Sequence, residues 1–362
     1  MSPQFGERPL AVRCGAFGDM VLLTALIRVL HAEFQVPVDI VTSGPWSEPL
    51  LRGQPGVGDV FSMRSRKAPY WLSADQRRVV RLLRARTPGP IWFCDGDDAA
   101  RPLLERAGIP QNYIVDVKDH PLLRGEHATQ QWRRFAQIMP GAAPAAHCTD
   151  ITAVTPGCFL EISQAQRVEL ESWLRVRGLA DRPLLTVQIG NKRTMRRGPR
   201  RLAANNKYWP LERWAEVLRF LSQRHPRHAI VLLGTGPEYQ LNRELASLAN
   251  VEGLHNAADD LPIPRLVAML GRADGLLTVD SGPAHAAAAV GCPQVVLFGK
   301  ALPSLYKPWG TAGADVELLR GEIDGEATML GIEAATVMAA WSRLELRGAR
   351  ADEARADGAP LP

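Results

Sequence analysis

The 362-residue chain is long enough for two domains of ordinary size, and its 46% hydrophobic and 22% charged residues are typical of globular proteins. No stretch approaches the roughly 20 apolar residues of a membrane span, and the start has no signal-peptide pattern. The five scattered cysteines lack the spacing of a zinc site. We therefore expect a cytoplasmic protein with reduced cysteines. The net charge of +5 favours acidic partners, such as phosphates or an anionic membrane surface, and no aromatic and basic module points to nucleic acid.

The first half of the chain alternates strands and helices, as chains that form a parallel sheet do. A strand at residues 10–13 runs into a glycine-containing turn, and apolar residues at helical spacing predict a helix over residues 20–33. The segment 64–86 is strongly basic, which suits a phosphate-bearing or anionic lipid partner, although a solvated helix face is the commoner explanation. Further strands are predicted at residues 38–41, 91–94 and 113–116.

A second α/β series follows a weakly patterned stretch between residues 141 and 182, which we interpret as a linker with a bridging helix at 164–177. We therefore expect two Rossmann-like domains, residues 1–160 and 161–346, and a charged, alanine-rich tail at 347–362 with the composition of a disordered segment. The strands predicted in this half are 184–189, 229–233, 275–279 and 294–298. The helices predicted in it are 211–223, 238–248, 263–271 and 333–344.

The stretch 278–299, TVDSGPAHAAAAVGCPQVVLFG, predicts a strand, a tight turn, a helix that begins near Pro283, and a second strand. Such a turn presents backbone N–H groups and the positive end of a helix dipole, which bind anions. Asp280 and Ser281 are also explained as helix caps, and His285 as a packed residue of the first turn. Capping explains the combination less well, because Asp280 follows a strand at the edge where α/β sheets bind ligands.

Two other glycine-containing turns follow predicted strands. RCGAFGDM holds Gly15, Gly18 and Asp19 in a spacing that is not the dinucleotide-binding fingerprint. Asp19 there is either a helix N-cap or a carboxylate that meets a substrate hydroxyl as a general base. LLGTGPEY at residues 232–239 places Glu238 after a strand, where a glutamate can bind ribose hydroxyls, although its glycines also serve an ordinary tight turn.

Two charged segments also follow strands. From Lys192 to Lys207 the chain holds seven basic residues and no acidic one. Most of these suit a solvated loop, but at least one is expected to face phosphate, and Lys207 is our choice because Tyr-Trp-Pro anchors it at a helix start. FCDGDDA contains Asp95 and Asp97 in a D-x-D pattern, which can hold a divalent ion on a nucleotide diphosphate but often arises by chance.

Taken together, these segments resemble glycosyltransferase family 9, the bacterial heptosyltransferase family of lipopolysaccharide core assembly, over about residues 10–344. The resemblance implies a GT-B fold, with two Rossmann-like domains facing a central cleft. It also implies inverting transfer of heptose from ADP-heptose to a lipopolysaccharide core acceptor, with no metal and no cofactor. The matching motifs are R-x-G-x-x-G-D at residues 13–19, K-x-W-P at 207–210, and D-S-G-P-x-H followed by A-x-x-x-G-x-P and L-F-G at 280–299.

Motif positions carry the roles of the family's residues onto this chain. Asp19 matches the general base, Lys207 the cation that binds the donor phosphates, and Asp280 a residue that holds the transferred sugar. Arg13 matches the first position of the R-x-G-x-x-G-D motif. The remaining acceptor-side candidates are Gly15, Gly18 and Asp95.

The other donor-side matches are expected to contact the nucleotide or to support the loop that binds it. Ser281 and Gly282 would meet the diphosphate through their N–H groups, Glu238 would contact the ribose, and His285 would hold the loop together. Because the stretch before Lys207 is longer than is usual in the family, Lys192 is an alternative phosphate ligand.

Several functional alternatives stay open at the level of sequence. The same fold can use another nucleotide-sugar donor or a different acceptor, since a motif does not report the details of a sugar pocket. A non-catalytic nucleotide- or glycan-binding relative and a metal-dependent transferase that uses Asp95 and Asp97 are further readings. An anionic glycolipid acceptor would imply peripheral contact with the cytoplasmic face of the inner membrane.

Overall fold

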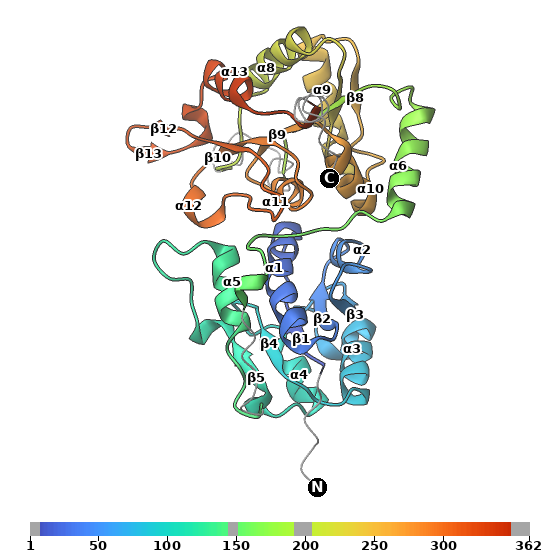
Figure 1. Ribbon diagram of the computed structural model, residues 1–362, viewed down its shortest axis with the longest axis vertical. Helices are drawn as coiled ribbons and strands as arrows, with labels where there is room; N and C mark the ends of the chain where they lie inside the picture. The colour runs from blue at the N-terminus through green and yellow to red at the C-terminus, as the bar shows by residue number, and fades with distance from the viewer. Residues whose placement is uncertain (1–7, 144–150, 192–204, 349–362) are drawn as a thin grey trace. The chain divides into compact units, whose positions relative to one another are not determined.

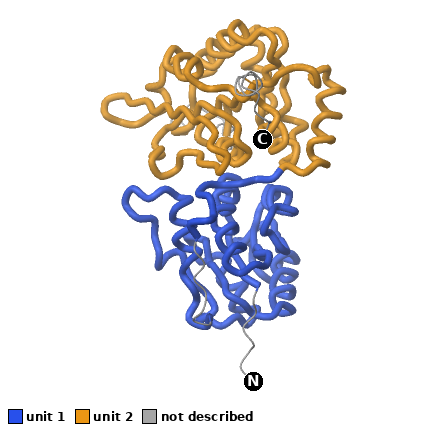
Figure 2. The backbone as a smooth tube through the Cα atoms, viewed as in Figure 1, with its two compact units in different colours: residues 1–161 blue, residues 162–362 orange. Residues whose placement is uncertain are grey.

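In the computed structural model, residues 8–143, 151–191 and 205–348 are described here. The chain divides into two compact units, residues 1–161 and 162–362 (Figure 2). The predicted disordered tail beyond residue 348 and the arginine-rich loop 192–201 lie outside the described residues. No helix in the described ranges is long and apolar enough to cross a membrane.

The first unit is built on a five-stranded parallel sheet in the order β3-β2-β1-β4-β5 (Figure 1). α1 packs against α5 and α3 against α4, as expected when helices cover both faces of a sheet. The strands are β1 (Leu10–Val12), β2 (Val38–Ser43), β3 (Val57–Met63), β4 (Ile91–Phe93) and β5 (Ile114–Asp116). The helices are α1 (Phe17–Phe34), α2 (Ser47–Leu51), α3 (Ala74–Ala85), α4 (Arg101–Ala107) and α5 (Ala128–Ala136).

The second unit has a six-stranded parallel sheet in the order β11-β10-β9-β6-β7-β8. α8 packs against α9 and α13, and α10 against α6 and α11. The strands are β6 (Leu184–Gln188), β7 (Ala229–Leu232), β8 (Leu254–Asn256), β9 (Gly275–Val279), β10 (Gln294–Phe298) and β11 (Val316–Arg320), with a separate hairpin of β12 (Glu322–Ile323) and β13 (Glu326–Ala327). The helices are α6 (Gln164–Val176), α8 (Leu211–Arg224), α9 (Tyr239–Ala249), α10 (Ile263–Arg272), α11 (Gly282–Ala289), α12 (Pro303–Tyr306) and α13 (Ala334–Arg343).

Burial explains why these segments form the central elements. β1, β4, β6, β9 and β10 are buried at every residue, as strands covered on both faces must be. α1 buries nearly its whole middle, from Met20 to Leu30, whereas α3 buries one face and leaves a charged one in water. The core of the second unit includes Trp209 and Trp214, whose rings meet edge to face at 4.9 Å.

Both sheets have the strand order of a doubly wound α/β fold, which confirms the predicted fold class. In chain order within each unit, the strands run 3-2-1-4-5 in the first sheet and 3-2-1-4-5-6 in the second. The order therefore reverses between β1 and β4 in the first unit and between β6 and β9 in the second. Ligands of such sheets bind beyond the carboxyl ends of the strands at this reversal.

Candidate active site

In the first unit, the polar residues of the R-x-G-x-x-G-D motif lie at the reversal between β1 and β4. Arg13, directly after β1, donates from Nη1 to the carbonyl of Cys94 at 2.7 Å and from Nη2 to Oδ1 of Asp19 at 3.0 Å. Asp95, after β4, accepts the N–H of Cys14 at 2.8 Å and lies 3.8 Å from Nη1 of Arg13. One guanidinium therefore links the ends of both central strands to the Asp19 carboxylate.

Asp19 is the third residue of α1 and is held in one orientation. Its Oδ2 accepts the N–H of Ala16 at 2.7 Å, so Asp19 caps the start of α1 from the third helical position, and the N-cap residue itself is Ala16. A Cβ on Gly15 would lie 2.4 Å from the Cβ of Asp19, which explains the glycine there, and Gly18 lies in the first turn of α1. The Asp19 side chain is 37% exposed. A carboxylate offers about four acceptor positions, so a substrate hydroxyl can still bind.

The two carboxylates of the D-x-D pattern share a positive partner. Arg66, from the loop after β3, contacts Oδ2 of Asp97 through Nη2 at 2.8 Å and lies 3.9 Å from Oδ2 of Asp95 through Nε. Burial raises the pKa of Asp95, whereas the hydrogen bond from Arg66 lowers the pKa of Asp97 to about 2. Within the described ranges, no group of histidine, cysteine or carboxylate side chains has the arrangement of a metal site. A guanidinium thus stands where the metal hypothesis would place the ion.

In the second unit, Lys207 and Asp280 meet at the reversal between β6 and β9. Lys207 Nζ lies 2.8 Å from Oδ2 of Asp280 and donates to its carbonyl at 2.7 Å. The Asp280 side chain is 9% exposed and that of Lys207 is 28% exposed. An ammonium has three donors, so one direction remains for a ligand after these two contacts. Sequence reasoning selected both residues separately and missed that they form an ion pair.

The turn after Asp280 leads into α11 without a side-chain cap. Ser281 is the N-cap residue, yet its side chain makes no capping hydrogen bond and lies 3.4 Å from the hydroxyl of Thr278 instead. The capping explanation for Ser281 is therefore not supported. Backbone N–H groups at Gly282 and beyond remain as donors for an anion. His285 is buried in the first turns of α11, in agreement with a packing role.

Glu238 is the last residue of the 3-10 turn η5 (Gly236–Glu238) between β7 and α9, and its side chain lies close to the backbone that follows β6. Its Oε2 accepts the N–H of Thr235 at 2.9 Å and the hydroxyl of Thr235 at 2.7 Å, while Oε1 is buried without a hydrogen bond among the described residues. A Cβ on Gly190 would lie 2.4 Å from that Oε1, so a larger residue there would displace the carboxylate. Burial raises the pKa of Glu238. One oxygen of this buried carboxylate thus still has the capacity to accept a hydrogen bond.

Gln188 is a candidate that sequence reasoning missed. It is the last residue of β6 and is buried, and it donates from Nε2 to the carbonyl of Gly190 at 3.3 Å. Its Oε1 has no hydrogen-bond partner in the described part of the chain, which is unusual for a buried amide. The available signal was a polar residue at the carboxyl end of an otherwise apolar central strand.

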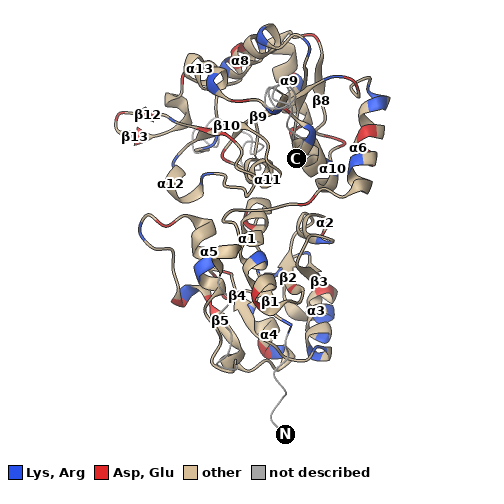
Figure 3. Ribbon diagram, viewed as in Figure 1, with Lys and Arg blue, Asp and Glu red and all other residues tan. Residues whose placement is uncertain are grey.

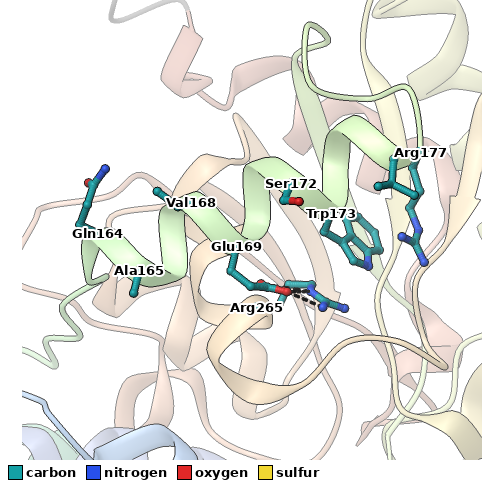
Figure 4. A pocket seen from close by; sticks show the side chains of 9 residues that line it. Gln164, Ala165, Val168, Glu169, Ser172, Trp173, Arg177 and Arg265 are labelled. Atoms are coloured by element: carbon teal, nitrogen blue, oxygen red, sulfur yellow. Dashed lines mark hydrogen bonds and ion pairs between the residues drawn. The ribbon is translucent and has the colours of Figure 1, made fainter.

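A groove along α6 is lined by other residues of the second unit. It has a volume of about 620 Å³ and is lined by Val168, Trp173 and Arg265, among others (Figure 4). Arg265 pairs there with Glu169. None of the candidate site residues lines this groove, and α6 follows no strand of the sheet. We therefore base the site on the strand ends.

Comparison with known proteins gives consistent matches over most of the chain. The model of glycosyltransferase family 9 (heptosyltransferase) matches residues 194–321. Lipopolysaccharide heptosyltransferase 2 of Salmonella typhimurium is 22% identical over 315 residues, which cover 84% of this chain and 86% of the relative. A crystal structure of a family 9 glycosyltransferase from Veillonella parvula superposes with a TM-score of 0.74 at 18% identity, covering 94% and 97% of the two chains. The E. coli heptosyltransferase WaaC with ADP superposes with a TM-score of 0.66 at 17% identity, covering 92% and 99%. These matches confirm the predicted GT-B fold.

Proposed function

Given that the chain belongs to glycosyltransferase family 9 and is an enzyme of that heptosyltransferase family, we propose that it transfers heptose, with inversion, from ADP-heptose to a lipopolysaccharide core acceptor. The observation that carries the proposal is the Lys207 and Asp280 ion pair at the strand reversal of the second unit, beside the uncapped start of α11. The named donor is supported by a relative whose solved structure contains ADP.

The second unit would bind the donor. The third donor direction of Lys207 and the N–H groups of Ser281 and Gly282 would meet the diphosphate, whose charge grows as ADP leaves. Asp280 would accept hydroxyls of the transferred sugar, and the unbonded Oε1 of Glu238 would accept those of the ribose. Because these groups already supply positive charge to the leaving diphosphate, we propose that no metal or cofactor is needed.

The first unit would supply the base. Asp19 would take the proton of the acceptor hydroxyl, and the resulting acceptor oxygen would attack the anomeric carbon. The bond from that carbon to the diphosphate oxygen would break, and ADP would leave with the bonding electrons. Arg13 would keep the Asp19 carboxylate in place, as its 3.0 Å contact indicates. Gly15 and Gly18 would let the acceptor approach the backbone, and Asp95 would hold Arg13 at the strand ends.

The acceptor would be an anionic glycolipid, so the protein would work at the cytoplasmic face of the inner membrane. Relatives carry the name lipopolysaccharide heptosyltransferase. The loops at the carboxyl edge of the first sheet carry Arg66, Lys67 and Lys118, of which Arg66 pairs with Asp97 and Lys118 with Asp98. Basic side chains of this kind suit phosphate groups on an acceptor.

Calorimetric titration with ADP, GDP, UDP and ADP-heptose, in EDTA and without added metal, tests the donor assignment. The proposal predicts selective binding of ADP and ADP-heptose. A preference for UDP or GDP would keep the phosphate contacts and overturn the donor. A lack of any binding would favour a non-catalytic relative, and binding that appears only with a divalent ion would restore a metal role for Asp95 and Asp97.

A further inference from the structure

The turn between β3 and α3 projects two large apolar side chains into solvent. Trp71 is 74% exposed and Leu72 is 64% exposed. All the other tryptophans of the chain lie in the described ranges, and each is buried or partly buried. Large apolar side chains held in water next to each other indicate a surface that is covered in use.

This exposure is built into the turn and does not come from a loose chain. The side chain of Gln76, which is buried, donates to the carbonyls of Ser65 and Ala68 at 2.9 Å each and so fixes the loop that precedes the turn. Arg77 donates from Nη1 to the carbonyl of Trp71 at 2.5 Å. The turn η1 (Tyr70–Leu72) therefore has a defined conformation with its last two side chains outward.

Tyr70 shows that the same turn also has an inner side. Its ring packs against the core of the first unit and lies 4.6 Å from the guanidinium carbon of Arg106. The core thus takes one aromatic residue of the turn and leaves its two neighbours outside. Trp71 and Leu72 are consequently available to a partner without any change in the fold.

The helix α3 next to this turn contains several basic residues, as Figure 3 shows. Arg77, Arg78 and Arg81 are exposed, whereas Val79, Val80 and Leu83 of the same helix are buried. None of the three arginines forms an ion pair with another residue of the described ranges. Residues 64–86 contain eight basic residues and one acidic residue, Asp75. The charge of this face is therefore only partly offset from within, by Glu48 near Arg78.

We propose that Trp71, Leu72, Arg77, Arg78 and Arg81, here called the Trp71 surface, dock the protein on an anionic lipid bilayer. Trp71 and Leu72 would enter the layer between headgroups and acyl chains, and the arginines would bind lipid phosphates. A bilayer offers both an apolar layer and dense negative charge, which matches the two halves of this surface. Leu72 has no ring for base stacking, so the pair fits lipid better than nucleic acid.

The same loop connects this surface to the candidate acceptor site. It contains Arg66, which donates to the carbonyl of Cys14 and pairs with Asp97. A protein docked through the Trp71 surface would therefore bind its lipid-linked acceptor on the side of the first unit that holds Asp19. This role in acceptor binding rests on the proposed function, whereas the binding of the Trp71 surface to lipid does not.

Co-sedimentation of the full chain with vesicles of phosphatidylcholine and phosphatidylglycerol tests the proposal, with pure phosphatidylcholine vesicles for comparison. At about 1 kcal/mol per basic residue near the surface, the triple variant Arg77→Gln, Arg78→Gln, Arg81→Gln should bind the anionic vesicles on the order of a hundredfold more weakly. A matched control removes three exposed arginines of the second unit, Arg167, Arg175 and Arg243, and should bind as the wild type does.

A second pair of variants tests the apolar half. Trp71→Ser with Leu72→Ser should weaken binding at least about tenfold and leave the remainder sensitive to salt. Val168→Ser with Val176→Ser, at exposed positions of α6 (Val168 is labelled in Figure 4), should have no effect. Brominated lipids should quench part of the tryptophan fluorescence of the wild type, and Trp71→Phe should abolish this quenching.

The outcomes separate this proposal from the proposed function. An unchanged melting temperature in all of these variants, together with vesicle binding that is lost only in the variants of the Trp71 surface, supports this surface and shows that the variants are folded. Equal losses in the variants and their controls, or no vesicle binding by the wild type, would overturn it. A wild-type dimer that the Trp71 and Leu72 substitutions dissociate would assign the surface to self-association instead.

Discussion

Replacement of Lys207 by Met isolates the cation that we assign to the donor phosphates. In the structure the ammonium makes two contacts to Asp280, at 2.8 and 2.7 Å, and the Asp280 side chain is only 9% exposed. Breaking a buried pair costs about 3–5 kcal/mol, but Lys207 is 28% exposed, so screening by water reduces the expected loss of unfolding free energy to about 1–2 kcal/mol. Loss of one charge-assisted hydrogen bond to phosphate should weaken ADP binding by about 10- to 100-fold.

A double variant separates these two effects. In Lys207→Met with Asp280→Asn, no buried charge is left unpaired, so most of the lost stability should return while ADP binding stays weak. The assays are chemical denaturation and calorimetric titration with ADP, and Lys118→Met, which removes a surface ion pair with Asp98, is the control that should change neither. Wild-type ADP affinity in Lys207→Met would refute the assignment, because Lys207 would then serve only Asp280 and the phosphate role would pass to Lys192.

Two further substitutions test other parts of the site. Burial raises the pKa of Glu238, so ADP binding should weaken as the pH falls through that raised pKa. Glu238→Gln should remove this dependence and lower ADP affinity at neutral pH. It should also raise the melting temperature, because a buried carboxyl group with a raised pKa makes the folded protein less stable as the pH rises through that pKa. Asp95→Asn should lower kcat by at least about tenfold with little change in the donor KM if Asp95 acts through Arg13 and Asp19, and an unchanged kcat would show that the contact is only structural.

Most of the fold is predictable from sequence because its central elements are strongly apolar. The prediction gave β9 and β10 with their observed ends, and it placed α8, α10 and α13 within one or two residues. It missed β3, β8 and β11, which lie at or beside sheet edges and bury only part of their side chains. Such strands carry little of the apolar signal on which the prediction depends. The helix α3 was not predicted either, because its many charged residues outnumber the few apolar residues of its narrow buried face.

Candidate site residues could be assigned one by one from the sequence, but their contacts could not. Asp19 and Asp280 each follow a predicted strand and so could be assigned to the ligand-binding edge of a sheet, whereas Lys207 was chosen because Tyr-Trp-Pro anchors it at a predicted helix start. The partners of these residues depend on which strands are neighbours in the sheet. Local sequence patterns do not predict the order of strands. The 3.0 Å contact between Arg13 and Asp19 and the ion pair of Lys207 with Asp280 therefore appear only in the structure.

The central claim is tested most directly by transfer itself. The measurement is mass-spectrometric detection of a heptosylated product from ADP-heptose and a lipopolysaccharide core acceptor, with the wild type and with Asp19→Asn. We expect product with the wild type, a loss of at least about a hundredfold in rate with Asp19→Asn, and nearly unchanged ADP-heptose binding by that variant. Transfer by Asp19→Asn within a few-fold of the wild-type rate would contradict the assigned base, and no transfer by a wild type that binds ADP-heptose would contradict the proposed acceptor.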